Sequence, residues 1–263
     1  MKKLLTIAFI FCFYYSFAQD LSLYQKKEYS SEGTVLPYRI LYPDAYDKSK
    51  KYPLVLFLHG AGERGNDNEK QLTHGAKLFL ADSNRKKFPC IVLFPQCPKD
   101  SSWGSVKVDR SKTPFAFAFD YTMPQTWVMK AVINLTKQVA ADESVDQSRI
   151  YISGLSMGGF GTFEAVYQYP GIFAAAMPVC GGGDSVHYDK RIKKTPFWIF
   201  HGDADAVVNV SNSRAMVSRL KSLKADVTYT EYPGVNHNSW DNAFAEPTYL
   251  SWMFSHKRKK VKL

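Results

Sequence analysis

Cysteine is scarce in this chain of 263 residues, and its positions exclude the usual cysteine-based frameworks. Of the four cysteines, Cys12 lies in an apolar N-terminal run, which leaves Cys90, Cys97 and Cys180. No pair has the Cys-x-x-Cys spacing of a structural zinc site, so we expect no metal. Cys90 and Cys97 flank an apolar run typical of a buried strand, and an extended segment of that length spans about 23 Å. Because a disulfide needs Cα atoms within about 7 Å, we expect no bond between this pair.

Long apolar runs are missing beyond the N-terminus, so the sequence predicts no membrane-spanning helix in the mature chain. Residues 1–18 have the three parts of a secretory signal peptide: two early lysines, an apolar run over 4–15, and Ser16-Phe17-Ala18 at the end. We expect cleavage before Gln19, with a retained membrane anchor as the alternative. The sequence therefore predicts a secreted or periplasmic protein with no stable membrane insertion after cleavage.

Acidic residues are outnumbered by basic ones, which gives a formal net charge of +10. Much of this excess lies at the C-terminus, where residues 257–263 form a basic tail. We interpret the tail as a solvated end, with attraction to an anionic surface as the alternative. One basic tail is not enough for nucleic-acid binding, so we expect no nucleic-acid partner.

Hydrophobic residues make up 45% of the chain and aromatic residues 15%, enough for a sizeable core. We place one domain at 19–256. Apolar runs alternate with helical patterns, as in an α/β protein. The predicted strands are Ser22–Tyr29, Val35–Tyr42, Leu54–Leu58, Ile91–Phe94, Ile150–Ile152, Ala174–Val179, Phe197–Phe200 and Val227–Tyr232. The predicted helices are Pro124–Ala141, Met157–Tyr169, Asn212–Leu223 after an N-cap at Ser211, and Pro247–Phe254. The pattern predicts a mostly parallel, doubly wound sheet of about eight strands with an antiparallel N-terminal hairpin.

One segment, residues 99–123, has no clear helical or strand period and is too long for an ordinary connection. It is rich in aromatic residues, among them Trp103. It follows a predicted strand at the end of the sheet where α/β proteins bind ligands. We expect this insertion to overhang the active site and to set the choice of substrate.

The strongest chemical signal is Gly154-Leu155-Ser156-Met157-Gly158, which has the form G-x-S-x-G. In a nucleophile elbow this pattern lies on a sharp turn between a strand and a helix. Here a predicted strand precedes it and a predicted helix follows it. We therefore predict that Ser156 is a catalytic nucleophile.

A serine nucleophile needs a base and an acid that orients the base, and in this fold the acid precedes the histidine along the chain. Asp203 and Asp205 follow one predicted strand, and His237 follows the next. We predict that His237 is the base and Asp205 the acid, with Asp203 as the alternative acid. His59 and His201 are interpreted as packed turn residues.

The oxyanion hole needs two backbone N–H donors. One is expected at Met157, the residue after the nucleophile. The other is expected in the loop His59-Gly60-Ala61-Gly62-Glu63-Arg64-Gly65, at Ala61 or Gly62. The loop lacks the Gly-Lys-Ser/Thr ending of a phosphate-binding loop. This chemistry requires no metal or organic cofactor.

Together, the segments HGAGERG, FPQCP, GLSMGG, HGDADAVV and GVNHNSW resemble the α/β-hydrolase superfamily. More narrowly they resemble carbohydrate esterase family 1, with feruloyl and acetylxylan esterases, and the dienelactone-hydrolase-like carboxylesterases. The resemblance covers Tyr38 to Phe254 and implies the same triad of Ser156, Asp205 and His237. Dienelactone hydrolases have a cysteine nucleophile, whereas this chain has a serine.

The sequence thus predicts an exported serine carboxylesterase that removes acetyl or feruloyl groups from plant polysaccharides. Trp103, Trp240 and Gly62 are the candidate substrate-binding residues. Two alternatives remain: a peptidase of the prolyl-oligopeptidase type, and a non-catalytic carbohydrate-binding protein on a hydrolase scaffold. Intact serine, aspartate and histidine positions argue against the second alternative.

Overall fold

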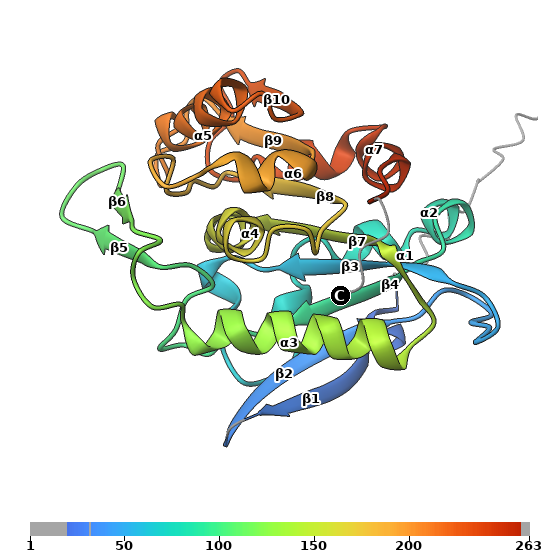
Figure 1. Ribbon diagram of the computed structural model, residues 1–263. Helices are drawn as coiled ribbons and strands as arrows, with labels where there is room; N and C mark the ends of the chain where they lie inside the picture. The colour runs from blue at the N-terminus through green and yellow to red at the C-terminus, as the bar shows by residue number, and fades with distance from the viewer. Residues whose placement is uncertain (1–19, 32, 259–263) are drawn as a thin grey trace, which may run out of the picture.

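The protein is an α/β structure built on one large sheet (Figure 1). The computed structural model describes residues 20–31 and 33–258. The expected signal peptide, 1–18, lies outside the described residues. The strands are β1 (Gln25–Ser31), β2 (Thr34–Leu41), β3 (Tyr52–Leu58), β4 (Ile91–Pro95), β5 (Val106–Asp109), β6 (Ala116–Phe119), β7 (Val145–Leu155), β8 (Ala175–Val179), β9 (Phe197–Gly202) and β10 (Val227–Tyr232).

The main sheet has the order β1-β2-β4-β3-β7-β8-β9-β10, which makes eight strands in the described part of the chain. β2 pairs antiparallel with β1 and with β4, and all other neighbours in this sheet are parallel. The predicted eight-stranded sheet with its antiparallel N-terminal hairpin is confirmed. Parallel strands must be joined by crossovers, and the helices supply most of them.

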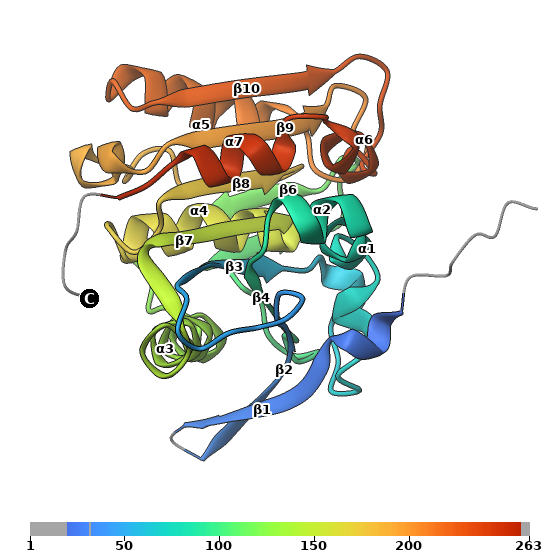
Figure 2. The ribbon, with the colours of Figure 1, turned by 90° about the vertical axis from the view of Figure 1, so that its right-hand side faces the viewer.

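Helices cover both faces of the sheet. They are α1 (Ala76–Leu80), α2 (Asp82–Lys87), α3 (Trp127–Asp142), α4 (Met157–Gln168), α5 (Ser211–Ser222), α6 (Trp240–Ala245) and α7 (Tyr249–Ser255), with short 3-10 helices η1 (Leu21–Leu23), η2 (Ala61–Glu63), η3 (Lys70–Leu72) and η4 (Lys190–Lys194). The core has two parts: α3, α4 and α5 pack on one face, and α1, α6 and α7 on the other. In Figure 2, α7 lies in front of the sheet and α4 behind it.

Neighbouring residues of one strand belong to opposite parts of this core. Leu54 and Leu56 face α3 and α4, whereas Val55 and Phe57 face the side of α1 and α7. Both sets are fully buried, because a parallel sheet is covered by helices on both sides. This arrangement explains why the sequence shows continuous apolar runs rather than alternation.

The four predicted helices are present as α3, α4, α5 and α7, and three shorter ones, α1, α2 and α6, were not predicted. Each of these has five or six residues, too few for an apolar period to show. The predicted N-cap of α5 is wrong by one position: Ser211 is its first residue, and Val210 takes the cap position.

The prediction that residues 99–123 lack regular structure is wrong. The segment contains an antiparallel hairpin of β5 and β6, which projects from the body in Figure 1. We call residues 105–120 the β5–β6 arm. Its sequence Phe115-Ala116-Phe117-Ala118-Phe119 alternates large and small residues, a period of two that indicated a strand.

The arm is held at its base and near its tip. At the base, Ser105 donates from its N–H and its hydroxyl to the Glu164 carboxylate of α4, at 2.5 and 2.9 Å. Burial raises the pKa of Glu164, and the two donated bonds from Ser105 partly offset that rise. Near the tip, the Phe115 N–H donates to the Val207 carbonyl at 3.2 Å. The arm is therefore tied to α4 and to the loop that follows β9.

The first residues of the C-terminal tail make contacts with β7. The Arg258 backbone N–H donates to the Ser148 carbonyl at 2.9 Å, and its guanidinium donates to the Gln147 carbonyl at 2.9 Å. Lys257 lies 3.5 Å from the Asp146 carboxylate. The exposed Lys257 is consistent with the predicted solvated tail, whereas the prediction is wrong for Arg258, and residues 259–263 lie outside the described part.

Cys90, Cys97 and Cys180 are free and buried, so the expectation of no Cys90–Cys97 disulfide is confirmed. Burial raises the pKa of the Cys90 thiol to about 12. No helix within residues 20–31 and 33–258 is long and apolar enough to cross a membrane.

Candidate active site

Ser156 lies on a sharp turn between β7 and α4, in a backbone conformation that residues other than glycine rarely adopt. Its φ is 53° and its ψ is −116°, and it occupies the N-cap position of α4. The turn is fixed because the Ser156 N–H donates to the Val179 carbonyl of β8 at 2.9 Å. Such strain persists only where the surroundings enforce it, and it is typical of functional sites.

The glycines of the G-x-S-x-G pattern are required by close backbone approach. A Cβ on Gly158 would lie 1.9 Å from the Leu58 carbonyl oxygen at the end of β3. A Cβ on Gly154 would lie 2.4 Å from the Gly158 carbonyl oxygen. These glycines let β7, β3 and α4 approach closely enough to form the turn that presents Ser156.

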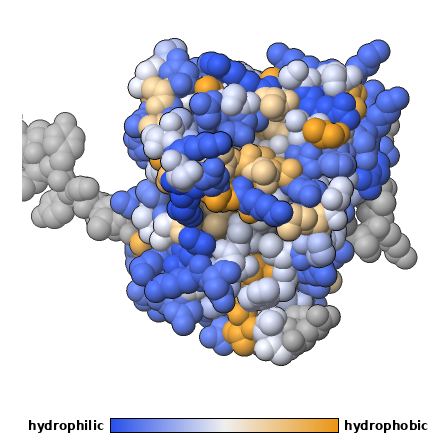
Figure 3. Space-filling model, turned by 90° about the vertical axis from the view of Figure 1, so that its left-hand side faces the viewer, coloured by the Kyte–Doolittle hydropathy of each residue, from blue (hydrophilic) through white to orange (hydrophobic). Residues whose placement is uncertain are grey.

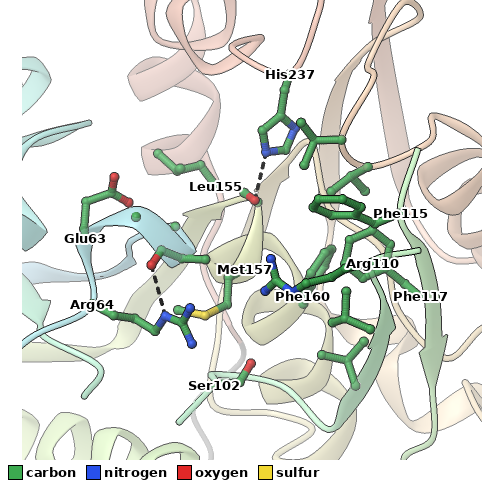
Figure 4. A pocket seen from close by; sticks show the side chains of 18 of the residues that line it. Glu63, Arg64, Ser102, Arg110, Phe115, Phe117, Leu155, Met157, Phe160 and His237 are labelled. Atoms are coloured by element: carbon green, nitrogen blue, oxygen red, sulfur yellow. Dashed lines mark hydrogen bonds between the residues drawn. The ribbon is translucent and has the colours of Figure 1, made fainter. Parts of the chain in front are cut away.

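The three predicted catalytic residues come together at the carboxyl ends of β7, β9 and β10. The His237 Nε2 lies 3.0 Å from the Ser156 hydroxyl, a bond marked by the dashed line at His237 in Figure 4. The His237 Nδ1 lies 2.7 Å from the Asp205 carboxylate. With Nδ1 donating to Asp205, Nε2 is free to accept the serine proton, as a general base must.

The Asp205 carboxylate is buried and held by several donors. It accepts from the Val207 and Val208 N–H groups, both at 2.8 Å, and the second oxygen lies 3.1 Å from His201. Burial works to raise the pKa of Asp205, but the bonds from His201, His237 and Val207 outweigh it and hold the pKa well below its usual range. The carboxylate therefore stays ionised and can stabilise a protonated His237.

Asp203 contacts the loop that follows β10 rather than the His237 side chain. Its carboxylate accepts from the Gly234 N–H at 2.6 Å, and so ties its loop to the loop that carries His237. In the sequence analysis Asp203 is the alternative acid, yet no bond joins it to His237. The geometry favours Asp205.

Backbone N–H groups without an acceptor among the described residues border the nucleophile. Met157 is the first residue of α4, so its N–H has no acceptor within the helix. Ala61 is the first residue of η2 and is in the same situation, and Gly62 follows it. Both loop residues line the pocket beside Ser156 and Met157. The geometry fits an oxyanion hole of Met157 with Ala61 or Gly62.

Arg64 holds this loop in place. Its Nε donates to the Ala61 carbonyl at 3.0 Å, and its Nη1 donates to the carbonyls of Lys99 and Ser101 at 3.1 and 3.2 Å. The guanidinium thus joins the loop after β3 to the segment after β4.

Trp103 does not lie in the pocket, so its prediction as a substrate-binding residue is wrong. Its side chain is 0% exposed, and its indole N–H donates to the His59 carbonyl at 3.0 Å. A Cβ on Gly161 of α4 would lie 2.5 Å from the Trp103 Cβ, so α4 and Trp103 are tightly packed. Trp103 fills space in the core, and nothing in the sequence distinguishes this role from that of a pocket residue.

His59 is a packed residue, as predicted. Its Nδ1 lies 2.6 Å from the Gly60 carbonyl, and its Nε2 accepts from the Cys97 N–H at 3.0 Å. Both bonds fit a neutral ring with the proton on Nδ1. Burial lowers the pKa of His59 to about 4. His201 is buried too, between Asp205 and the Ser213 hydroxyl.

The triad opens into a pocket of about 380 Å³ at the carboxyl edge of the sheet. Figure 3 shows the corresponding face of the molecule, hollowed near its middle, with apolar side chains inside and hydrophilic ones around them. Trp240 lines this pocket, as predicted, and its ring meets His237 edge-on at 5.4 Å between centroids. Gly62 also lines it.

The insertion over residues 99–123 borders the active site, as expected, but the residues by which it and its neighbours line the pocket were not singled out from the sequence. The arm contributes Val106, Val108, Arg110, Phe115 and Phe117, which form a mostly apolar wall. The loop after β3 contributes the charged residues Glu63 and Arg64, and α4 contributes Phe160. The alternating aromatic residues of the arm were the one signal that indicated part of this wall.

The chain has clear relatives. A model of the phospholipase/carboxylesterase family matches residues 45–247. Carboxylesterase SOBER1 of Arabidopsis thaliana is 25% identical over 195 residues, which cover 70% of this chain and 82% of that protein. The bifunctional acetylxylan esterase/xylanase XynS20E of Neocallimastix patriciarum is 27% identical over 186 residues, 69% of this chain and 24% of that protein.

Solved structures share the fold. A thermostable esterase superposes with a TM-score of 0.81 at 37% identity over 90% of this chain, which spans 64% of that protein's length. A ferulic acid esterase from Anaeromyces mucronatus, solved with ferulic acid, gives a TM-score of 0.62 at 18% identity over 94% of this chain and 99% of that one. At 18% identity the likeness shows the fold alone.

The geometry and the family match agree. Ser156 is strained at the turn between strand and helix, and it forms a hydrogen-bonded row with His237 and the buried Asp205 carboxylate. The family model matches most of the chain. The chain belongs to the phospholipase/carboxylesterase family of the α/β-hydrolase superfamily and is a carboxylic ester hydrolase.

Proposed function

We propose that this protein is an exported serine esterase that removes acetyl or feruloyl groups from plant polysaccharides. The observation that carries the proposal is the hydrogen-bonded row Asp205–His237–Ser156, at 2.7 and 3.0 Å, at the base of an aromatic-walled pocket. No metal or organic cofactor takes part in the proposed reaction.

In the first half-reaction, the Ser156 hydroxyl oxygen attacks the ester carbonyl carbon while His237 Nε2 takes the serine proton. The carbonyl oxygen becomes an oxyanion, and the N–H groups of Met157 and of Ala61 or Gly62 stabilise it. When the carbon–oxygen bond to the alcohol breaks, His237 returns the proton to the leaving alcohol. The product is an acyl group bound to Ser156.

In the second half-reaction, a water molecule attacks the acyl carbon and gives its proton to His237. The second oxyanion collapses, the bond to Ser156 breaks, and the proton passes to the serine oxygen. Asp205 remains ionised throughout, because its pKa is held low. It keeps the histidine proton on Nδ1 and stabilises the imidazolium that forms in each half-reaction.

The choice of acyl group rests on the pocket. A volume of about 380 Å³ accepts an acetyl group and has room for a phenolic acid. The rings of Phe115, Phe117 and Phe160 offer apolar faces that suit a feruloyl ring or a sugar ring. The acetylxylan esterase relative supports the same substrate class.

Export is proposed from the sequence of residues 1–18, with its two lysines and its apolar run. A polysaccharide substrate fits an exported enzyme, since such polymers stay outside the cell. The site of cleavage before Gln19 is open to a direct check: the N-terminal sequence of the protein recovered outside the cytoplasm.

The decisive experiment measures acetate and ferulate released from native xylan and pectin by the purified protein. We expect release of at least one acid by the wild type and none by Ser156→Ala. A proline-containing peptide amide tests the peptidase alternative in the same preparation. Cleavage of the peptide without release of either acid would overturn the proposal.

A further inference from the structure

The pocket carries an excess of positive charge. Its ionisable lining residues within the described part of the chain are Glu63, Arg64, Arg110 and His237. Two of these are guanidinium groups, which stay protonated at any pH at which the protein is folded. With His237 neutral, the pocket has two positive groups and one negative group.

The one negative group is turned away from the open pocket. The Glu63 side chain is only 12% exposed, and its Oε1 lies 3.8 Å from His74. Its Oε2 is buried and has no hydrogen-bond partner among the described residues. Figure 4 shows Glu63 and Arg110 on opposite sides of the pocket. Glu63 therefore does not neutralise Arg110.

Arg110 lies on the arm, at the turn between β5 and β6, and is exposed. Figure 4 shows its nitrogen atoms pointing toward the centre of the pocket. Its guanidinium lies over the Phe115 ring, 5.4 Å from the centroid. No carboxylate within the described part of the chain lies within 4 Å of it. The neighbouring Asp109 is engaged instead with Ser111 and Lys112.

The two guanidinium groups differ in what they can offer a ligand. Arg64 donates three hydrogen bonds to backbone carbonyls, and these bonds hold the loop of residues 59–65, which carries the expected oxyanion-hole donor. Arg110 donates no hydrogen bond to any residue that the structure describes, and the Phe115 ring beneath it restricts where the planar group can lie. A planar guanidinium with free donors matches a carboxylate, which it binds through two parallel bonds.

On the basis of the proposed esterase function, we propose that Arg110 is a specificity-determining residue that binds a carboxylate on the substrate. The preferred substrate is then an acyl ester on an acidic glycan, one whose sugar units carry carboxylates, rather than on a neutral one. The ester lies at Ser156 while a neighbouring sugar carboxylate reaches Arg110 at the pocket mouth.

The test compares two esters that differ only in charge: acetylated trigalacturonate and its uncharged carboxamide derivative. The measured quantity is the ratio of their kcat/KM values from acetate release. We expect the wild type to prefer the anionic ester about fivefold, and Arg110→Gln to remove most of this preference. Because the contact is between charges near solvent, the wild-type ratio should also fall as sodium chloride is raised.

Lys112→Gln is the matched control. The substitution removes one positive charge from the same hairpin. Lys112 does not line the pocket, and its Nζ lies 3.8 Å from the Asp109 carboxylate, outside the pocket. This variant should keep the wild-type ratio. Arg110→Lys keeps the charge but loses the paired donors, and should retain part of the preference.

The outcomes separate the two proposals. If the wild type hydrolyses neither 4-nitrophenyl acetate nor either oligosaccharide, the esterase function itself fails. If it hydrolyses 4-nitrophenyl acetate and both oligosaccharides with equal kcat/KM, only the role of Arg110 is overturned. Equal loss of the ratio in Arg110→Gln and Lys112→Gln would also overturn it, because the effect would then come from net charge alone.

Discussion

Two regions border the same pocket and are built in opposite ways: the elbow that carries Ser156, and the β5–β6 arm. The elbow is buried among β3, β7, β8 and α4, and a Cβ on Gly158 would meet the Leu58 carbonyl oxygen at 1.9 Å. The arm is a two-stranded hairpin with half-exposed side chains. The elbow fixes the positions of the reacting atoms, whereas the side chains of the arm can be substituted with less effect on packing and can set the choice of substrate.

This difference indicates that the elbow determines the reaction and that the arm determines the choice of substrate. Close packing leaves few residue types that fit the elbow, so its sequence is restricted and easily recognised. The arm needs only its two anchors, Ser105 on Glu164 and Phe115 on Val207. Changes at the elbow and its acid should therefore affect all substrates, and changes on the arm should alter the choice among them.

The largest effect is expected at the acid that serves the elbow. Asp205→Asn would present an amide to His237 and favour the wrong tautomer, which can cost about 10⁴ in kcat. Asp203→Asn is the matched control, because an amide oxygen can still accept from the Gly234 N–H. We expect near-normal kcat for that variant. Steady-state kinetics on 4-nitrophenyl acetate measures both, and a larger loss in Asp203→Asn would refute the assignment of the acid.

A second effect concerns His59, packed beneath the oxyanion loop. Its folded pKa is about 4 because of burial, below the unfolded value of about 6.5. The folded state therefore holds the ring neutral, and the stability this supplies is present above pH 6.5 and is lost as the pH falls toward 4. The full loss is about 3 kcal/mol.

Urea unfolding at pH 7 and pH 4 measures this loss, with His59→Gln as the comparison. The stability gap between wild type and variant should narrow by about 3 kcal/mol at the lower pH. Groups such as Asp205 titrate in both proteins and cancel in the difference. A gap that stays constant with pH would show that His59 is not buried in its neutral form.

The smallest effect is expected on the arm. Phe117 lines the pocket, whereas Phe119 does not, although both rings lie 5.1 Å from Phe160 between centroids. Phe117→Ala should lower kcat/KM for a feruloyl ester about fivefold relative to an acetyl ester, through loss of one aromatic contact. Phe119→Ala should leave that ratio unchanged. Equal ratios in the two variants would remove Phe117 from substrate selection.

This contrast also explains what the sequence could predict. Gly154, Ser156 and Gly158 were found because the turn between strand and helix admits few alternatives. Asp205 was preferred to Asp203, and in the structure Asp205 is bonded to His237, whereas Asp203 accepts from the Gly234 N–H of another loop. The sheet followed from continuous apolar runs, which only burial on both faces explains.

The remainder depended on tertiary contacts. Trp103 belongs to the same insertion as Phe117, and only the structure shows that it packs under His59 while Phe117 lines the pocket. Short helices such as α6 are set by packing rather than by their own period. Arg110 is one of many exposed basic residues in the sequence, and its place at the pocket depends on how the hairpin folds back.

The central claim is that Ser156, activated by His237 and Asp205, is the nucleophile of an ester hydrolase. The most direct test is to treat the protein with a fluorophosphonate and to locate the adduct by peptide mass spectrometry. The account predicts one adduct per chain, on Ser156, with loss of activity in proportion to labelling, and no adduct in a folded Ser156→Ala protein. Labelling of another residue, or ester turnover retained by Ser156→Ala, would contradict it.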